Sequence, residues 1–358
     1  MKVAIVCPFN IDRLTGSPKR AKTSIRAASR VAEVFSVSAS GTPDVAVRAV
    51  QTGKVGLFSF TKAAMVELRH FDPDIVHGLS AASVPVLVFC RLMRPRAKVI
   101  YELHGWAWYE QALSPLWKRC ILSMFDRVGL WVAHEVVAVS YSGERFLKKR
   151  APNHARIRVL WDPIDFISEY RPREGSGTVV GYLGNAAWYQ GIEHIIDAAR
   201  LLAGDPTISF RIAGVGMERF PRFPNIEYVS VPREDTISFL HSCDIHISSR
   251  VPSPVSEVQF AHKLLEYMSA GRSVIVSDVS DQRMVVERAR CGYVVRPLSG
   301  ETIAHAIRTF AGLSADERKA QALRAVEFAR NNFYAEGYVE KMRDLYESTL
   351  RPIAAARV

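Results

Sequence analysis

Short apolar runs alternate along the chain with longer segments in which apolar residues recur every three or four positions. In the first half the short runs occupy residues 3–7, 35–39, 75–77, 98–103, 136–140 and 158–161. Runs this short and this uniformly apolar are typical of parallel strands that are buried on both faces. The segments at residues 22–34 and 115–133 have the pattern of helices that cover such a sheet.

A second series follows residues 169–178, a polar stretch rich in turn-forming residues. Its strands are expected at 179–183, 209–213, 227–229, 245–248 and 274–276, and its helices at 191–202, 236–241 and from 263 onward. The last helix should present an apolar face made of Phe333, Tyr338, Met342, Leu345 and Leu350. Because 358 residues exceed one ordinary core, the pattern predicts two α/β domains, at 1–168 and 178–335, and a terminal helix at 337–358.

Residues 260–278 carry the most functional information. Leu264 and Met268 belong to an apolar helical stripe, whereas Lys263 and Glu266 lie on another face near the helix start. Such a helix start offers amide donors and a cation to a phosphate group, and a carboxylate to the two hydroxyls of a ribose. The pattern also fits a surface helix with a solvated i, i+3 ion pair. The segment by itself leaves both interpretations open.

The segment resembles the nucleotide-sugar motif of family 4 retaining glycosyltransferases, in the variants that read K-L-L-E-Y-M-x-A-G. The resemblance implies the GT-B fold, in which two Rossmann-like domains face each other across a cleft and the last helix returns to pack on the first domain. It implies that Glu266 holds the ribose hydroxyls of the donor and takes part in catalysis. Lys263 and Leu265 of the same motif are then donor-binding residues.

A glycine-bounded loop, from Gly184 to Gly191, joins a predicted strand to a predicted helix. Such a loop leaves amide donors unpaired at a helix N-terminus, although it could be a plain strand-to-helix connection. The family usually has Arg and Lys where this chain has Asn185 and Gln190, and those two cations neutralise the leaving diphosphate. Lys263 and Arg250 are therefore the candidates to hold the diphosphate here.

Other positions match the family pattern to different degrees. His104 ends a strand of the first half, where a family histidine approaches the donor sugar, so it is a candidate catalytic residue. Gly16 and Gly214 stand where the family has small residues near the donor. The family also has a second Glu at the position of Val258, and Glu257 is one residue away and is not expected to act in catalysis. His77, His134 and His241 are expected to be structural.

Basic residues are concentrated in the first half of the chain. Residues 1–170 hold 24 Lys and Arg against 14 Asp and Glu, a balance of +10 within a total of +11. Such a domain could attract nucleic acid, an anionic membrane or a phosphorylated substrate, but no nucleic-acid-binding module is recognisable, so no nucleic-acid partner is expected. An aromatic and basic tract suits a membrane interface, unless its aromatic rings pack in the core. It consists of Trp106, Trp108, Tyr109, Leu113, Leu116, Trp117, Lys118 and Arg119.

Five cysteines without a C-x-x-C pair predict buried thiols in a reducing compartment and no structural zinc. No apolar run approaches the ~18 residues that a membrane span requires. The chain is therefore expected in the cytoplasm, with the inner face of a membrane as a possible surface of attachment.

Together, these features predict a retaining glycosyltransferase of the hexosyltransferase type. Its partners would be a nucleotide-diphosphate sugar and an acceptor glycan or lipid-linked glycan in cell-envelope polysaccharide or glycolipid biosynthesis. Amide donors and cations at helix N-termini can replace a divalent metal, and no D-x-D motif follows a suitable strand, so no cofactor is expected. Two alternatives remain open. Asn185, Gln190 and Val258 favour a non-catalytic GT-B binding or regulatory subunit, and a nucleotide-sugar 2-epimerase is the other.

Overall fold

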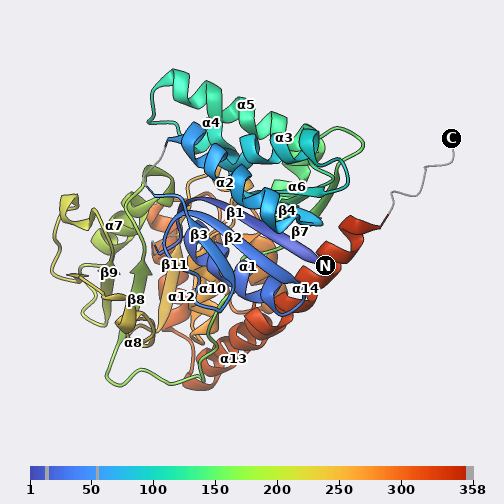
Figure 1. Cartoon of the computed structure of the whole chain (residues 1–358). Helices are drawn as coiled ribbons and strands as arrows, with labels where there is room; N and C mark the ends of the chain where they lie inside the picture. Colours follow the sequence, from blue (N-terminus) through green and yellow to red (C-terminus); the bar gives the residue numbers. More distant parts are fainter. Residues whose placement is uncertain (13–15, 54–55, 352–358) are drawn as a thin grey trace. The chain divides into compact units, whose positions relative to one another are not determined.

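The structure is a computed structural model that describes residues 1–12, 16–53 and 56–351. It divides into two compact units (Figure 1). Unit 1 consists of Met1–Pro163 together with Ala335–Val358, and unit 2 consists of Ile164–Tyr334. Residues 352–358 of the expected terminal helix lie outside the described residues.

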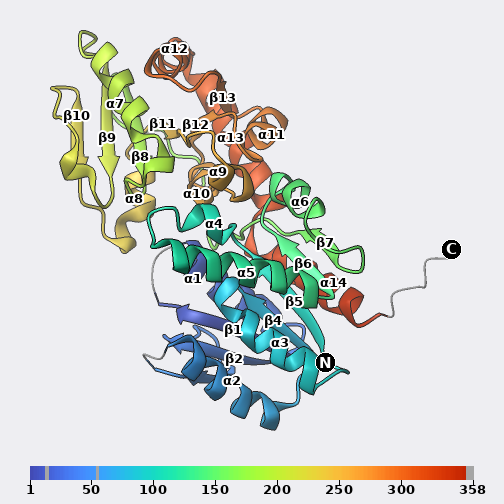
Figure 2. The same ribbon diagram turned by 90° about the horizontal axis from the view of Figure 1, so that it is seen from above.

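Unit 1 contains a seven-stranded sheet in the order β3-β2-β1-β4-β5-β6-β7, in which all neighbours are parallel. The strands are β1 (Lys2–Asn10), β2 (Glu33–Ser40), β3 (Arg48–Gln51), β4 (Ile75–Leu79), β5 (Lys98–Leu103), β6 (Glu135–Ala138) and β7 (Arg156–Val159). The helices are α1 (Gly16–Ser29), α2 (Leu57–Phe71), α3 (Val84–Met93), α4 (Ala107–Glu110), α5 (Leu116–Val132), α6 (Tyr141–Lys148) and α14 (Ala335–Leu350) (Figure 2).

Helices cover both faces of this sheet because successive strand residues point to opposite sides. On one face Ile100 of β5 packs in a core cluster with Ile25 of α1 and Met342 of α14. On the other face Tyr101 donates a hydrogen bond of 2.6 Å to Asp126 of α5. The C-terminal helix α14 is therefore part of the core of unit 1.

Unit 2 contains a six-stranded parallel sheet in the order β10-β9-β8-β11-β12-β13. The strands are β8 (Thr178–Leu183), β9 (Ile208–Ala213), β10 (Ile226–Val229), β11 (Ile245–Ser248), β12 (Ser273–Ser277) and β13 (Gly292–Val295). The helices are α7 (Ile192–Leu201), α8 (Thr236–His241), α9 (Pro254–Val258), α10 (His262–Ser269), α11 (Gln282–Ala289), α12 (Gly300–Ala311) and α13 (Ala315–Asn332). Strand residues such as Phe210 and Ile212 pack with Ile195 of α7 and Ile303 of α12 in its main core cluster.

The predicted fold class, two α/β units built on parallel sheets, is confirmed. One predicted helix, residues 22–34, is misplaced, because α1 runs from Gly16 to Ser29 and Val34 already belongs to β2. Phe333 does not lie on the apolar face of the last helix: it precedes α14 and its ring packs against Phe260 and Phe328 in unit 2. Leu350 is 38% exposed.

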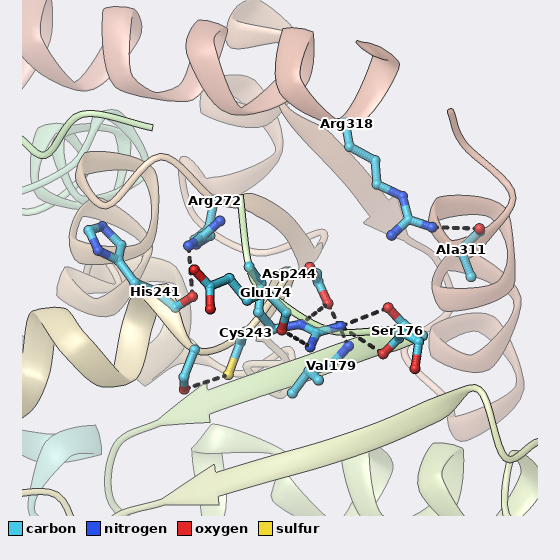
Figure 3. A network of polar contacts seen from close by, with 12 residues as sticks. Glu174, Ser176, Val179, His241, Cys243, Asp244, Arg272, Ala311 and Arg318 are labelled. Carbon is cyan, nitrogen blue, oxygen red and sulfur yellow. Dashed lines mark hydrogen bonds and ion pairs between the residues drawn. The ribbon is translucent and has the colours of Figure 1, made fainter. Parts of the chain in front are cut away.

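The polar stretch at 169–178 belongs to unit 2 and is tied to its sheet through one guanidinium (Figure 3). Arg173 Nε donates to Asp244 Oδ2 over 2.7 Å, and a terminal nitrogen donates to the carbonyl groups of Ser176 and Gly177. The same Asp244 oxygen accepts the backbone N–H of Val179 at 2.8 Å. These bonds fix the path by which the chain enters β8, the strand that leads to the glycine-bounded loop.

Candidate functional site

The carboxyl ends of β8, β9 and β11 lie at one edge of the parallel sheet of unit 2, where ligands of such sheets bind. Gly184 follows β8 and Gly214 follows β9, and their backbones are in contact. A Cβ added at Gly214 would lie only 1.6 Å from the carbonyl oxygen of Gly184. Gly214 also has φ +138°, so a side chain at this position is excluded on two grounds. The two predicted glycine turns thus form one surface of exposed backbone.

Lys263 extends from the first turn of α10 to this surface. Its Nζ donates to the hydroxyl of Tyr182 over 2.7 Å and to Oε1 of Gln190 over 2.9 Å. A Cβ at Gly184 would come within 2.6 Å of Nζ. The structure therefore brings together three of the predicted donor-binding residues, from the loop and from the helix.

The charge of Lys263 is not neutralised by a direct ion pair with any residue that the structure describes, because both partners of its Nζ are uncharged. Burial lowers the pKa of Lys263 well below its usual value, and the Arg250 guanidinium lowers it further, while Glu266 acts in the opposite direction. An anion that reached Nζ would stabilise the ammonium form.

Arg250 is the second cation in this part of unit 2. It follows β11, is 3% exposed, and donates to Oε1 of Gln259 over 2.7 Å. Its guanidinium lies 5.3 Å from the centre of the Tyr189 ring, which belongs to the glycine-bounded loop. Arg250 is thus held in place by an amide and an aromatic ring.

Glu266 is 7% exposed and lies in a helix that is buried over most of its length. Its Oε1 is 3.6 Å from Nε2 of His262, and no direct ion pair joins it to Lys263 in the part of the chain that the structure describes. The interpretation of this segment as a surface helix with a solvated i, i+3 ion pair is therefore wrong. Gly271 has φ +66° and ends the segment in the left-handed conformation.

The remaining predicted residues of unit 2 are buried or shape the backbone around the site. Leu265 is fully buried. Oδ1 of Asn185 accepts the N–H of Ala187, which shapes the loop. Gly191 has φ +65°, and a Cβ there would lie 2.0 Å from the carbonyl oxygen of Ser249.

The second carboxylate of the family pattern has no counterpart at this position. Val258 is 1% exposed within α9. The neighbouring Glu257 accepts the backbone N–H of Ser280 at 3.2 Å through Oε2.

In unit 1, His104 follows β5, and both of its ring nitrogens are hydrogen-bonded. Its Nε2 is 2.6 Å from Oε1 of Glu102, and its Nδ1 is 2.9 Å from Oγ of Ser17. Ser17 lies in the first turn of α1, next to Gly16. An ionised carboxylate can only accept, so Nε2 must carry the proton, and in the neutral ring Nδ1 accepts from the serine hydroxyl.

Glu102 was not predicted, and it organises this cluster. It is fully buried and accepts a hydrogen bond of 2.6 Å from Nε of Arg20, whose other nitrogen donates to Asp162 over 2.7 Å. Burial would raise the pKa of Glu102, but Arg20 and the hydrogen bonds from His104 and His77 hold it well below its usual value. Arg20 is thus a buried ion-pair residue, 1% exposed.

A signal for Glu102 existed in the sequence, because a carboxylate interrupts an otherwise apolar strand run, and such a residue requires a partner. His77 is buried within unit 1, with Nδ1 3.3 Å from the hydroxyl of Tyr346 in α14, in agreement with its predicted structural role. Among the described residues, no group of three His, Cys, Asp or Glu side chains could hold a metal ion, and no helix is long and apolar enough to cross a membrane.

Comparison with known proteins gives a family match for part of unit 2 and a fold for the whole chain. Residues 177–312 match the family model described as glycosyl transferases group 1. No curated protein matches the chain.

Solved structures resemble the whole chain at low identity. Sucrose-phosphate synthase from Thermosynechococcus elongatus is 14% identical with a TM-score of 0.77, covering 97% of this chain and 98% of its own. HepE of Anabaena in complex with UDP-glucose is 15% identical with a TM-score of 0.74, covering 97% and 100%. WaaG, a glycosyltransferase involved in lipopolysaccharide biosynthesis, is 16% identical with a TM-score of 0.70, covering 96% and 99%. At this identity the likeness establishes the fold.

The lowered pKa of Lys263 predicts that binding of inorganic pyrophosphate weakens as the pH rises. Only the ammonium form attracts the anion, and raising the pH through the lowered pKa removes that charge. Calorimetric titration at several pH values, in two buffers with different heats of ionisation, should show proton uptake on binding. Lys263→Gln should abolish the uptake, and Lys319→Gln, which changes an exposed lysine of α13, should not. Affinity that is independent of pH, without proton exchange, would contradict this assignment.

Proposed function

We propose that this chain is a glycosyltransferase that transfers a sugar from a nucleotide-diphosphate sugar with retention at the anomeric carbon. The match of residues 177–312 to the glycosyl transferases group 1 model and the GT-B fold of its two sheets support this. The observation that carries the proposal is the buried ammonium of Lys263 at the contact between the Gly184 and Gly214 turns. Exposed backbone and a cation without a direct counter-ion are the surroundings that a diphosphate requires.

The family usually has Arg and Lys where this loop has Asn185 and Gln190. These two replacements fit a loop that holds a cation from elsewhere in place of supplying its own. Gln190 stands where a family lysine is usual, and its side-chain oxygen accepts a hydrogen bond from Lys263. The loop thus positions a cation that comes from α10. Arg250 supplies a second positive charge beside it. These two cations and the loop amides would stabilise the charge that builds up on the leaving diphosphate, without a metal cofactor.

The rest of the nucleotide would extend from the diphosphate in two directions. Glu266 would accept the ribose hydroxyls, as its place in the motif implies. A cavity of about 390 Å³ next to the Gly214 turn is lined by Val215, Phe220, Tyr228 and Val231, among others, and would hold the nucleobase. HepE of Anabaena was solved with UDP-glucose, so UDP is the first nucleotide to test.

His104 would bind the transferred sugar in the role that the family resemblance implies. With its Nε2 proton committed to Glu102, Nδ1 can accept a hydrogen bond from a sugar hydroxyl that displaces Ser17. Glu102 would then set the tautomer, and Arg20 would keep Glu102 ionised. In the same-face attack of retaining relatives, the leaving phosphate takes the proton of the acceptor, so no side-chain nucleophile is required.

For the acceptor we propose a glycan or lipid-linked glycan of the cell envelope, reached at an anionic membrane surface by a cytoplasmic enzyme. Of the aromatic tract in unit 1, Trp106 is buried, as the core interpretation requires. The others include strongly exposed apolar side chains: Leu113 is 92% exposed, Leu116 63% and Trp117 66%. They belong to the half of the chain, residues 1–170, that carries a charge balance of +10, which would attract an anionic surface.

A non-catalytic binding subunit is the second candidate, and the surroundings of Val258 favour it. The position of the second family carboxylate is apolar and buried, and Glu257 is bonded to the backbone at Ser280. Such a subunit would bind the nucleotide sugar but would not turn it over.

Turnover of a donor separates the two candidates. The protein is incubated with a panel of UDP-, GDP- and dTDP-sugars, and hydrolysis of the donor and the melting temperature are measured, with and without EDTA. One donor should be hydrolysed slowly and raise the melting temperature, and both effects should survive chelation. A donor that only raises the melting temperature would indicate the binding subunit. Loss of hydrolysis with EDTA would contradict the metal-independent mechanism.

Removal of the Glu266 carboxylate should weaken UDP binding by about 1.5–3 kcal/mol, the usual cost of losing hydrogen bonds to a charged group. Glu266→Ala is compared by calorimetric titration with Glu287→Ala, which removes an exposed carboxylate of α11 that is paired with Arg283. Equal affinities for UDP in Glu266→Ala and in the unmodified protein would rule out a ribose contact.

Sedimentation with vesicles tests the membrane surface. Binding to vesicles containing phosphatidylglycerol should exceed binding to phosphatidylcholine vesicles at low salt and decline as salt is added, because exposed charges are screened. Trp117→Ser should weaken binding about tenfold, because it removes an indole that the membrane interface would bury. Phe58→Ser, which removes an exposed ring from α2, is the control. Failure to bind either kind of vesicle at low salt would favour a soluble acceptor.

A further inference from the structure

A cavity of about 380 Å³ opens in unit 1 between α4, α5 and the chain segment after α6. Three aromatic residues of the segment that follows β5, Trp106, Trp108 and Tyr109, form part of its lining. The cavity lining also includes Met124 and Arg127 of α5, and Arg150. Trp106 comes two residues after His104 in the sequence, the histidine to which a sugar role is assigned above.

Aromatic rings and carbonyl groups, and no carboxylates, hold the cations at this cavity. The guanidinium of Arg150 lies 3.7 Å from the centre of the Phe146 ring and donates to the Phe146 carbonyl over 3.0 Å. Beside the cavity, Arg119 lies 4.3 Å from the Trp108 ring and donates to the Trp108 carbonyl. Stacking of this kind orients a guanidinium without neutralising its charge. Arg150 is thus placed to receive an anion.

The lining contains no Asp or Glu among the residues that the structure describes. The nearest buried carboxylate, Asp126 of α5, uses both oxygens inside the protein. It accepts from the hydroxyl of Tyr101 at 2.6 Å and from the N–H of Ala107 at 2.7 Å, which fastens α4 to α5. Arg127, next to it in sequence, is exposed and has no ion pair in the described part of the chain. Two guanidiniums therefore face this cavity with no carboxylate in its lining.

Apolar side chains continue from this cavity on the same helices. Met124, in the lining, is 51% exposed, and Trp117, two turns earlier in α5, is 66% exposed. Leu113, in the turn between α4 and α5, is 92% exposed. A cationic, ring-lined cavity next to exposed apolar residues matches a molecule with an anionic head and an apolar chain.

We propose that this cavity is the acceptor-head site, and that it binds a phosphate ester carried on an apolar chain, with the phosphate on Arg127 and Arg150. The proposal rests on the proposed function, since it specifies the acceptor of that reaction. The aromatic rings contact the part of the acceptor next to the phosphate, and the chain follows α5 past Met124 and Trp117. Binding at this site involves no covalent step.

Cys120 makes the site directly observable. It belongs to the cavity lining and is the exposed cysteine of the five, whereas Cys7, Cys90, Cys243 and Cys291 are buried. Burial raises the pKa of Cys90, Cys243 and Cys291 to about 12, and that of Cys7 still higher, so these thiols react slowly. A maleimide should therefore label Cys120 first, and a molecule in the cavity should slow that labelling.

The test is the rate of Cys120 labelling in the full chain, followed by mass spectrometry, with geranyl phosphate, geraniol and inorganic phosphate as probes. Geranyl phosphate should protect Cys120 at concentrations about tenfold or more below those needed for the other two probes, because it uses both the guanidiniums and the apolar surface. Arg127→Glu should raise the required concentration about tenfold or more, by reversing a phosphate contact. Lys62→Glu, the same charge change on the exposed surface of α2, should have no effect.

Three results would overturn the proposal. Equal protection by geraniol would reduce the cavity to an apolar patch, and equal protection by inorganic phosphate would remove the apolar chain from the ligand. Absence of protection by all three probes, with Cys120 still labelled first, would leave the cavity without a phosphate ligand. None of these measurements uses a donor nucleotide, so their failure is distinguishable from failure of the UDP-binding and turnover experiments.

Discussion

The parallel direction of the strands is the constraint on which the functional residues of both units depend. All strands of each sheet, within the described residues, run parallel to their neighbours, so the loops that follow the strands gather at one edge. In unit 2 that edge brings the turns after β8 and β9 into backbone contact, and only glycine fits where they touch. In unit 1 it places His104 at the end of β5, next to the first turn of α1. Residues far apart in sequence become neighbours for this reason alone.

Buried charge gives each edge its chemical character, and the two units use it differently. In unit 2 the ammonium of Lys263 is surrounded by a phenol and an amide, which orient it without cancelling its charge. In unit 1 the carboxylate of Glu102 is paired with Arg20 and serves as the acceptor for His104. The first arrangement suits recognition of an anion, because among the described residues the cation has no direct ion pair. The second suits orientation of a neutral imidazole, because its charges are already matched.

Much of the fold could be predicted because buried parallel strands leave short, largely apolar runs, and the strands at 98–103 and 245–248 lie where such runs predict them. Strand β3 escaped prediction because Arg48–Gln51 is an edge strand with exposed residues and no apolar run. The start of α1 at Gly16 escaped it because apolar periodicity becomes clear only after the first turn.

The candidate site was predictable only as far as a local motif extends. The motif around Lys263 and Glu266 identified the helix, and the glycines identified the turns. The partner of Lys263 was not predictable: Gln190 counted as the loss of a cation, whereas its side chain accepts a hydrogen bond from the cation of α10. Arg20 and Glu102 are 82 residues apart, and no pattern in a single sequence reveals such a pair.

The position of α14 makes unit 2 an insertion within unit 1, and this has a consequence for synthesis of the chain. Met342 and Tyr346 of α14 fill the core that β1, β4 and α1 leave open, and Tyr346 contacts His77 of the Glu102 cluster. Domains tend to fold as they emerge from the ribosome, from the N-terminus onward. Here the order is reversed, because unit 2 is complete while unit 1 still lacks its last helix. The Glu102 cluster, which α14 completes through the contact of Tyr346 with His77, is therefore the last part of unit 1 to be assembled.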